Sequence, residues 1–182
     1  MTTWILLRGL TRESRHWGDF VGQFQQVFPT HQILPLDLPG NGLLNLQTSP
    51  SRVDKMVEHC RVQLRQRKKE PPYNLLAMSL GAMVALGWTQ LYPHEVAAQV
   101  LINTSLRRLS PFYRRLLPGN YGRLLCLLLY GAEAPDAERV ILHMTSNRSD
   151  EAVLPLWLAL RRANPVSTSN ALRQLLAALV RP

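Results

Sequence analysis

The stretch that decides the fold is Tyr73-Asn-Leu-Leu-Ala-Met-Ser79-Leu-Gly81, followed by an apolar helical pattern that ends near Tyr92. The run before Ser79 has the short, continuous apolar character of a strand buried on both faces, and the residues after it have the length of a helix. Ser79 is therefore predicted to stand on a tight turn between a strand and a helix. Small residues two positions before and after it, Ala77 and Gly81, would let the two elements approach closely.

The same alternation of short apolar runs and helical patterns extends to both sides of this turn. Strands are predicted at residues 3–9, 31–37, 73–78 and 95–103, and helices at 16–28, 49–70 and 80–92, the second opened by a serine cap in Ser49-Pro50-Ser51. The order is βαβαβαβ. Short crossovers of this kind require parallel strands, so the fold class is α/β, a doubly wound parallel sheet.

A serine on such a turn can act as a nucleophile if backbone donors stabilise the oxyanion that forms. The N–H of Leu80, at the start of the helix, is one candidate donor. The loop Arg8-Gly9-Leu10 after the first strand could offer a second through Leu10. Two plainer interpretations stay open, namely that Ser79 only caps a helix and that Gly9 only ends a strand.

Three motifs in this order resemble the α/β-hydrolase superfamily of esterases and lipases. Arg8-Gly9-Leu10 is similar to the family's His-Gly-x oxyanion loop, Asp37-Leu-Pro-Gly-Asn-Gly42 to its Asp-x-Pro-Gly-x-Gly turn, and Ala77-Met-Ser-Leu-Gly81 to its nucleophile elbow. The resemblance implies a serine hydrolase of carboxylic esters or similar small acyl compounds, with Ser79 as nucleophile and the Leu10 and Leu80 N–H groups as oxyanion hole. It implies no cofactor and no metal. Arg8, Asn41 and Ala77 depart from the family's usual histidine, histidine and glycine.

The resemblance also implies a division of the chain. Residues 1–105 would form the hydrolase core portion, and residues 106–182, with helical periodicity and no convincing strand, a helical cap or lid. The family places its catalytic acid and histidine after the cap, so the chain resembles an N-terminal portion without that segment and is expected to be inactive by itself. Other titratable residues are expected to be structural: His16, His31, His59, His94, His143, Asp136 and Asp150.

Composition narrows the class of protein. With 46% hydrophobic and 18% charged residues the chain is globular rather than disordered. Two cysteines, Cys60 and Cys126, are too few for a disulfide scaffold or a zinc site and favour the cytoplasm. The first residues carry no basic segment typical of a signal peptide, and no apolar run is long enough to span a membrane.

The net charge of +9 raises a rival function, a basic binding module. The excess lies in residues 106–182, where the arginine pairs Arg107-Arg108, Arg114-Arg115 and Arg161-Arg162 could steer an anionic acyl substrate or an acidic carrier protein, or simply form a solvated helix face. Aromatic residues there form no repeated stacking platform, which disfavours nucleic acid. A non-catalytic, degenerate hydrolase is the other alternative.

The strand at residues 96–103 is predicted to be an edge of the sheet, because in the family the next strand would pair with it. It contains no proline or lysine to discourage pairing, so self-association is expected. A lysine at Val100 or Ile102 is expected not to prevent association, since both side chains would lie in a sheet buried on both faces.

Overall fold

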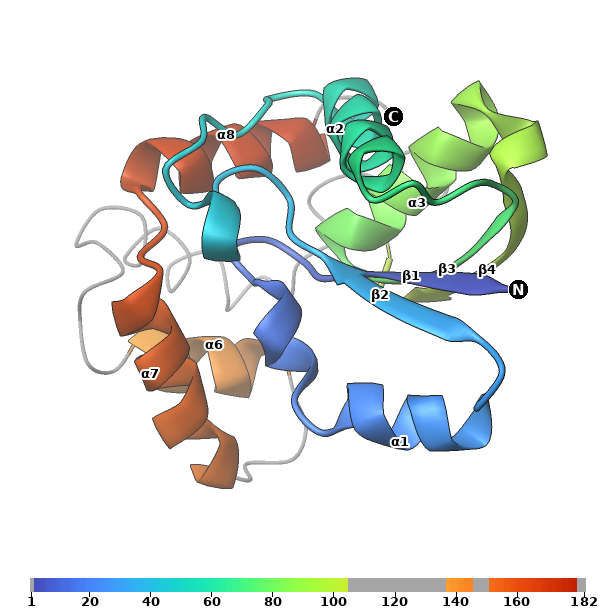
Figure 1. Ribbon diagram of the computed structural model, residues 1–182. Helices are drawn as coiled ribbons and strands as arrows, with labels where there is room; N and C mark the ends of the chain where they lie inside the picture. Colours follow the sequence, from blue (N-terminus) through green and yellow to red (C-terminus); the bar gives the residue numbers. More distant parts are fainter. Residues whose placement is uncertain (1, 105–136, 146–150, 180–182) are drawn as a thin grey trace.

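The computed structural model describes residues 2–104, 137–145 and 151–179. Strands, α-helices and short 3₁₀ helices (η) alternate along the chain as the sequence predicts (Figure 1). In chain order they are β1 (Thr3–Leu7), η1 (Ser14–Trp17), α1 (Phe20–Val27), β2 (Gln32–Leu36), η2 (Gly42–Leu44), α2 (Val53–Gln66), β3 (Tyr73–Met78), α3 (Leu80–Leu91), η3 (Pro93–Glu95), β4 (Val96–Ile102), α6 (Ala137–Thr145), η4 (Glu151–Val153), α7 (Leu154–Ala163) and α8 (Thr168–Leu179).

The four strands form one parallel sheet in the order β2-β1-β3-β4. Leu7 of β1 is in register with Leu36 of β2 and with Ala77 of β3, and Ala77 is in register with Leu101 of β4. The predicted doubly wound parallel sheet is confirmed. Because β3 lies between β1 and β4, the turn that follows it is at the centre of the sheet's carboxyl edge, where ligands bind in open α/β sheets.

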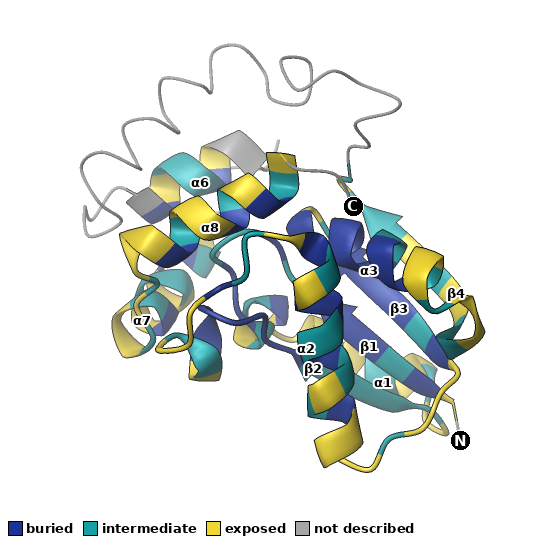
Figure 2. Ribbon diagram, turned by 90° about the horizontal axis from the view of Figure 1, so that it is seen from above, coloured by how far each residue is buried: buried dark blue, intermediate teal, exposed yellow. Residues whose placement is uncertain are grey.

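Helices cover the two faces of the sheet unequally. Figure 1 shows α2 and α3 on one face and α1 on the other, with α6, α7 and α8 gathered beyond the carboxyl ends of the strands. The larger core lies under α2 and α3 and includes the fully buried Leu64, Leu75 and Trp88 together with Ala177 of α8. The α1 face holds a smaller cluster built around Leu6, Trp17 and Leu76. In Figure 2 the buried residues run through β1, β3 and α3.

Two predicted helix boundaries were wrong. The helix predicted at residues 16–28 is split into η1 and α1 by Gly18, which has a φ of 53°. Ser49 does not cap α2: the helix begins at Val53, and Ser49 N–H instead donates to Asn170 Oδ1 at 2.9 Å. The residue at the N-cap of α2 is Arg52, which makes no side-chain cap hydrogen bond, and Ser49 is joined to α8 instead.

β4 is an edge of the sheet, but it is not buried on both faces as expected. Val100 is 46% exposed, and β4 has no fully buried residue. The expectation failed because α1 lies over β1 and β2 and leaves the neighbouring part of that sheet face uncovered by any described helix. A long polar side chain at Val100 could therefore reach solvent.

The helical region after the sheet is present as α6, α7 and α8, and α8 contributes to the same core as the sheet. No helix in the described ranges has the length and apolar character needed to cross a bilayer. Several residues singled out in the sequence lie outside the described residues: Arg107, Arg108, Arg114, Arg115, Cys126, Asp136 and Asp150.

Candidate active site

Ser79 connects the end of β3 to the start of α3 and is exposed to solvent. Its backbone has φ 54° and ψ −118°, a conformation that residues with a side chain rarely adopt. Two hydrogen bonds hold this strained turn: Ser79 N–H donates to Ile102 O at 3.0 Å, and Ser79 O accepts from Met83 N–H at 3.2 Å. Strain of this kind persists where surrounding structure imposes it, most often at functional sites.

Two glycines let the end of β1 pack against this turn. A β-carbon on Gly9 would lie 3.0 Å from Ser79 Cβ and 3.5 Å from Ser79 Oγ. A β-carbon on Gly81, in the first turn of α3, would lie 2.6 Å from Arg8 O and 2.7 Å from Leu7 O. No side chain fits at Gly81, and a side chain at Gly9 would force Ser79 or the loop to shift, so the loop after β1 and the N-terminus of α3 are in direct contact.

Leu10 and Leu80, the two predicted oxyanion donors, flank Ser79 from these two segments. Leu80 is the first residue of α3, so its N–H has no acceptor within the helix. Leu10 follows Gly9 in a turn closed by a hydrogen bond from Arg12 N–H to Gly9 O at 3.2 Å. The structure therefore brings the two segments together, and the convergence of their N–H groups on one oxyanion stays a prediction.

The turn that begins at Asp37 supports the loop after β1. Asp37 is buried and accepts hydrogen bonds from Ser14 N–H at 2.6 Å and from Leu43 N–H at 3.2 Å. Burial raises the pKa of Asp37, and these two N–H bonds oppose the increase. Asn41 is fully buried, and its side-chain amide donates to Arg12 O at 3.0 Å. Both side chains are used to fix the backbone.

Gln174 of α8 completes this support, and the sequence reasoning missed it. Its Oε1 accepts from Thr11 N–H at 2.8 Å, and its Nε2 donates to Asn41 Oδ1 at 2.8 Å. One turn earlier, Asn170 donates to Asn45 O and Gln47 O. The only signal in the sequence is a pair of amide side chains four residues apart on the stripe of α8 that also carries the buried Ala177.

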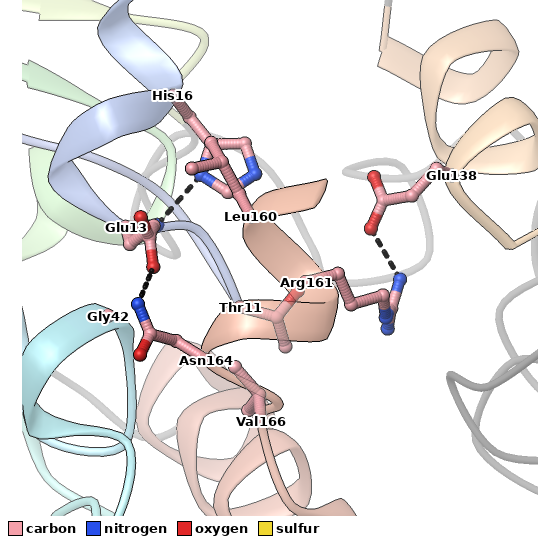
Figure 3. A pocket seen from close by; sticks show the side chains of 9 residues that line it. All are labelled: Thr11, Glu13, His16, Gly42, Glu138, Leu160, Arg161, Asn164 and Val166. Carbon is pink, nitrogen blue, oxygen red and sulfur yellow. Dashed lines mark hydrogen bonds and ion pairs between the residues drawn. The ribbon is translucent and has the colours of Figure 1, made fainter. Parts of the chain in front are cut away.

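A cluster of buried charges joins the helical region to the loop after β1. Glu138 of α6 is 2% exposed and pairs with Arg12, with Glu138 Oε2 2.6 Å from Arg12 Nη1, and with Arg161 of α7. Glu13 accepts from Asn164 Nδ2 at 3.0 Å. Glu13, Glu138, Arg161 and Asn164 line a cavity of about 10 Å³, enough for about one water molecule, and Figure 3 shows their side chains around it.

None of the five histidines, all in described segments, forms a hydrogen bond with Ser79. His16 is nearest in sequence to the loop after β1, but its Nδ1 accepts from Glu13 N–H at 3.1 Å. Burial, followed by the charges of Arg12 and Arg8, lowers the pKa of His16 to about 3. Such a weakly basic imidazole is unsuited to remove a proton from a serine. The other four are placed as follows: His31 directly before β2, where its Nδ1 accepts from Trp4 Nε1–H, His59 half-buried on α2, His94 exposed on η3, and His143 exposed on α6.

No group of three or more His, Cys, Asp or Glu side chains within the described ranges could hold a metal ion. Cys60 is a free, fully buried thiol, and burial raises its pKa to about 12, which makes it a poor nucleophile. Ser79, in contrast to Cys60, is exposed and lies on a strained turn.

Comparison with known proteins supports this assignment of the fold. The family model of the alpha/beta hydrolase fold matches residues 5–127. The protein YbdG of Bacillus subtilis is 26% identical over 85 residues, which cover 47% of this chain and 26% of that protein.

Solved structures with the same fold include enzymes. A carboxylesterase of Nitrososphaera gargenis superposes with a TM-score of 0.69 at 14% identity, covering 100% of this chain and 65% of that one. Rv0554 of Mycobacterium tuberculosis gives a TM-score of 0.69 at 17% identity, with the same coverage. The RedJ thioesterase of Streptomyces coelicolor gives 0.64 at 13% identity, covering 100% and 61%. The chain thus spans less than two thirds of the length of these proteins.

Proposed function

The chain belongs to the α/β-hydrolase fold family, and on that premise we propose that it is a serine hydrolase of carboxylic esters or similar acyl compounds, with Ser79 as the nucleophile. The observation that carries the proposal is the strained, exposed turn at Ser79, which lies at the carboxyl end of a central parallel strand with Gly9 packed against it. A helix cap needs neither the strain nor the close approach of a second loop.

The mechanism follows from this arrangement. Ser79 Oγ attacks the acyl carbon while a base takes its proton, and the carbonyl oxygen becomes an oxyanion that accepts hydrogen bonds from Leu10 and Leu80 N–H. Collapse of the intermediate breaks the ester bond, and the leaving alkoxide takes up the proton. Water then cleaves the acyl-serine to release the acid and regenerate Ser79.

The base is the missing part of this mechanism among the described residues, because no histidine is hydrogen-bonded to Ser79. We therefore expect the 182-residue polypeptide alone to turn esters over poorly, since a serine hydroxyl without a base stays protonated at neutral pH. Soluble imidazole can replace a missing histidine. It provides a test that separates a non-catalytic fold from a nucleophile that lacks its base.

The test is to incubate the polypeptide with p-nitrophenyl butyrate, with and without imidazole, and to locate the butyryl group by peptide mass spectrometry after acid quenching. We expect imidazole to promote butyrylation at Ser79, and Ser79→Ala to remove it. Ser51→Ala, a serine in the segment before α2, serves as the matched control and should leave it unchanged. Equal labelling of wild type and Ser79→Ala would overturn the proposal and favour the non-catalytic binding module.

The cytoplasmic location, the acidic carrier partner and the division at residue 105 into core and cap stay predictions. Part of the predicted cap has a structural role that supports the proposal: α8 holds the loop after β1 through Gln174, and α6 holds it through Glu138. A helical region that fixes the oxyanion loop is expected to influence acyl transfer even where it does not touch the substrate.

A further inference from the structure

Arg8 lies beside the candidate nucleophile, at the carboxyl ends of β1 and β3. Its Nη1 is 3.5 Å from the sulfur of Met78, the residue before Ser79, and its guanidinium carbon is 4.9 Å from the centre of the Trp17 ring. The next residue, Gly9, is the one packed against Ser79. The positive charge of Arg8 is therefore held by an aromatic face and a thioether next to the turn.

Neither contact supplies negative charge. Within the described residues Arg8 has no carboxylate partner, and its Nε is buried without a hydrogen-bond acceptor. Arg12, four residues later, pairs with Glu138, and Arg61 pairs with Glu95 at 2.7 Å. Burial, followed by the charge of Arg12, lowers the pKa of Arg8 to about 10, so it still carries its charge at neutral pH. A half-buried cation for which the described residues supply no counter-ion is costly unless another negatively charged group neutralises it.

A second donor without an acceptor lies in the same place. Trp17 is 8% exposed, and its indole Nε1 is buried with no hydrogen-bond partner in the part of the chain described. At the carboxyl end of β4, the buried hydroxyl of Thr104 is also unpartnered. Indole N–H and guanidinium N–H groups can only donate. The described residues at this edge of the sheet supply no acceptor for these donors, and a negatively charged acceptor would also balance the charge of Arg8.

We propose that Arg8 binds a carboxylate of the substrate, so that the ester cleaved at Ser79 carries a free acid group. This inference rests on the proposed function, which supplies the reaction. A carboxylate fits better than a simple halide because its two oxygens match the planar donor fork of arginine. Arg8 would then determine specificity without taking part in bond breaking.

Binding tests this inference separately from catalysis. The probes are monomethyl succinate, which carries one carboxylate, and dimethyl succinate, which carries none, titrated by calorimetry into the Ser79→Ala variant of the full 182-residue chain. We expect roughly ten- to 100-fold tighter binding of the monoester, the range for a charge-assisted hydrogen bond. Arg8→Met should abolish this preference, and Arg8→Lys, which keeps the charge but loses the fork, should reduce it. Arg65→Met, at an exposed arginine on α2, is the matched control and should retain it.

Each outcome decides the matter. Equal affinity for the two probes, or an unchanged preference in Arg8→Met with a native near-ultraviolet dichroism spectrum, overturns the inference. If Arg8→Met does not fold, an unchanged preference for the monoester in Arg8→Lys overturns the inference instead. Inorganic phosphate that competes as well as monomethyl succinate would show that the site takes any oxyanion rather than a carboxylate. In the imidazole-assisted reaction, Arg8→Met could lower kcat by the same factor for the monoester and the diester. That result would show that Arg8 acts on the oxyanion and not on a substrate carboxylate. Preferential binding without acylation of Ser79 would contradict the proposed function alone.

Discussion

Gly9 packs against Ser79 so closely that a β-carbon at position 9 would lie 3.0 Å from the Ser79 β-carbon. This one contact therefore fixes the position of the proposed nucleophile relative to the loop that carries one proposed oxyanion donor. Any change that separates the two segments should alter acyl transfer before it alters the fold.

Gly9→Ala tests this coupling. The added methyl group must displace either Ser79 or the loop, so we expect imidazole-assisted butyrylation of Ser79 to fall by about tenfold or more, in keeping with the loss of one oxyanion donor. Gly22→Ala is the matched control: it has nothing within 4 Å and lies inside α1, so it should leave acylation unchanged and stabilise the protein by about 0.5–1 kcal/mol. Wild-type acylation in Gly9→Ala would contradict the coupling.

Gln174→Met should destabilise the fold, although it preserves the length of the side chain. It leaves Thr11 N–H and the buried Asn41 Oδ1 without their partner, and each unsatisfied group costs about 1–3 kcal/mol. We expect the free energy of unfolding in urea to fall by about 2–4 kcal/mol. Arg173→Met, on the exposed side of the same helix, should change it by less than about 0.5 kcal/mol. A similar loss of stability in both variants would show that any change in α8, and not the loss of the Gln174 hydrogen bonds, lowers the free energy of unfolding.

His16 should make the protein sensitive to acid. Its pKa is about 3 in the folded chain and about 6.5 when unfolded, so between these values the unfolded state binds the extra proton. Its contribution to stability is complete above pH 6.5 and decreases by about 1.4 kcal/mol per pH unit as the pH falls towards 3.

The measurement is the free energy of unfolding between pH 7 and pH 4. His16→Asn, which keeps an acceptor for Glu13 N–H but does not titrate, should lower the pH dependence by about that slope. His94→Asn, at an exposed position, should keep the wild-type slope. Parallel curves for wild type and His16→Asn would mean that His16 is not buried in neutral form.

The open edge of β4 should make the chain self-associate. We expect light scattering to report a mass above that of one chain, rising with concentration, and Val100→Lys to shift it towards the monomer, because lysine on an edge strand discourages pairing. The substitution should be tolerated, since Val100 is 46% exposed. Val62→Lys, at a 40% exposed residue of α2, is the control that should leave association unchanged. A wild-type chain that stays monomeric at every concentration would refute this prediction.

The order of strands and helices, and the place of Ser79 between them, could be predicted from the sequence because both depend on neighbouring residues. Apolar runs of strand length, helical spacing and the small residues around Ser79 are local patterns, and a parallel sheet follows from short crossovers. Gly9 could be recognised as a turn position, and Gly81 as a small residue beside the turn at Ser79, for the same reason. What each of them touches, 70 or more residues away, could not.

Contacts between distant segments were decided only by the tertiary structure. Thr11 N–H meets Gln174 across 163 residues and Arg12 meets Glu138 across 126, and the local sequence around either partner contains no sign of the other. The same holds for the exposure of Val100, which depends on how far α1 extends over the sheet, and for Arg8, whose missing counter-ion is apparent only once its neighbours are placed. Hydrophobic periodicity specifies which face of an element is buried, but the pairing of polar groups depends on which elements meet there, and that is set by packing of the whole chain.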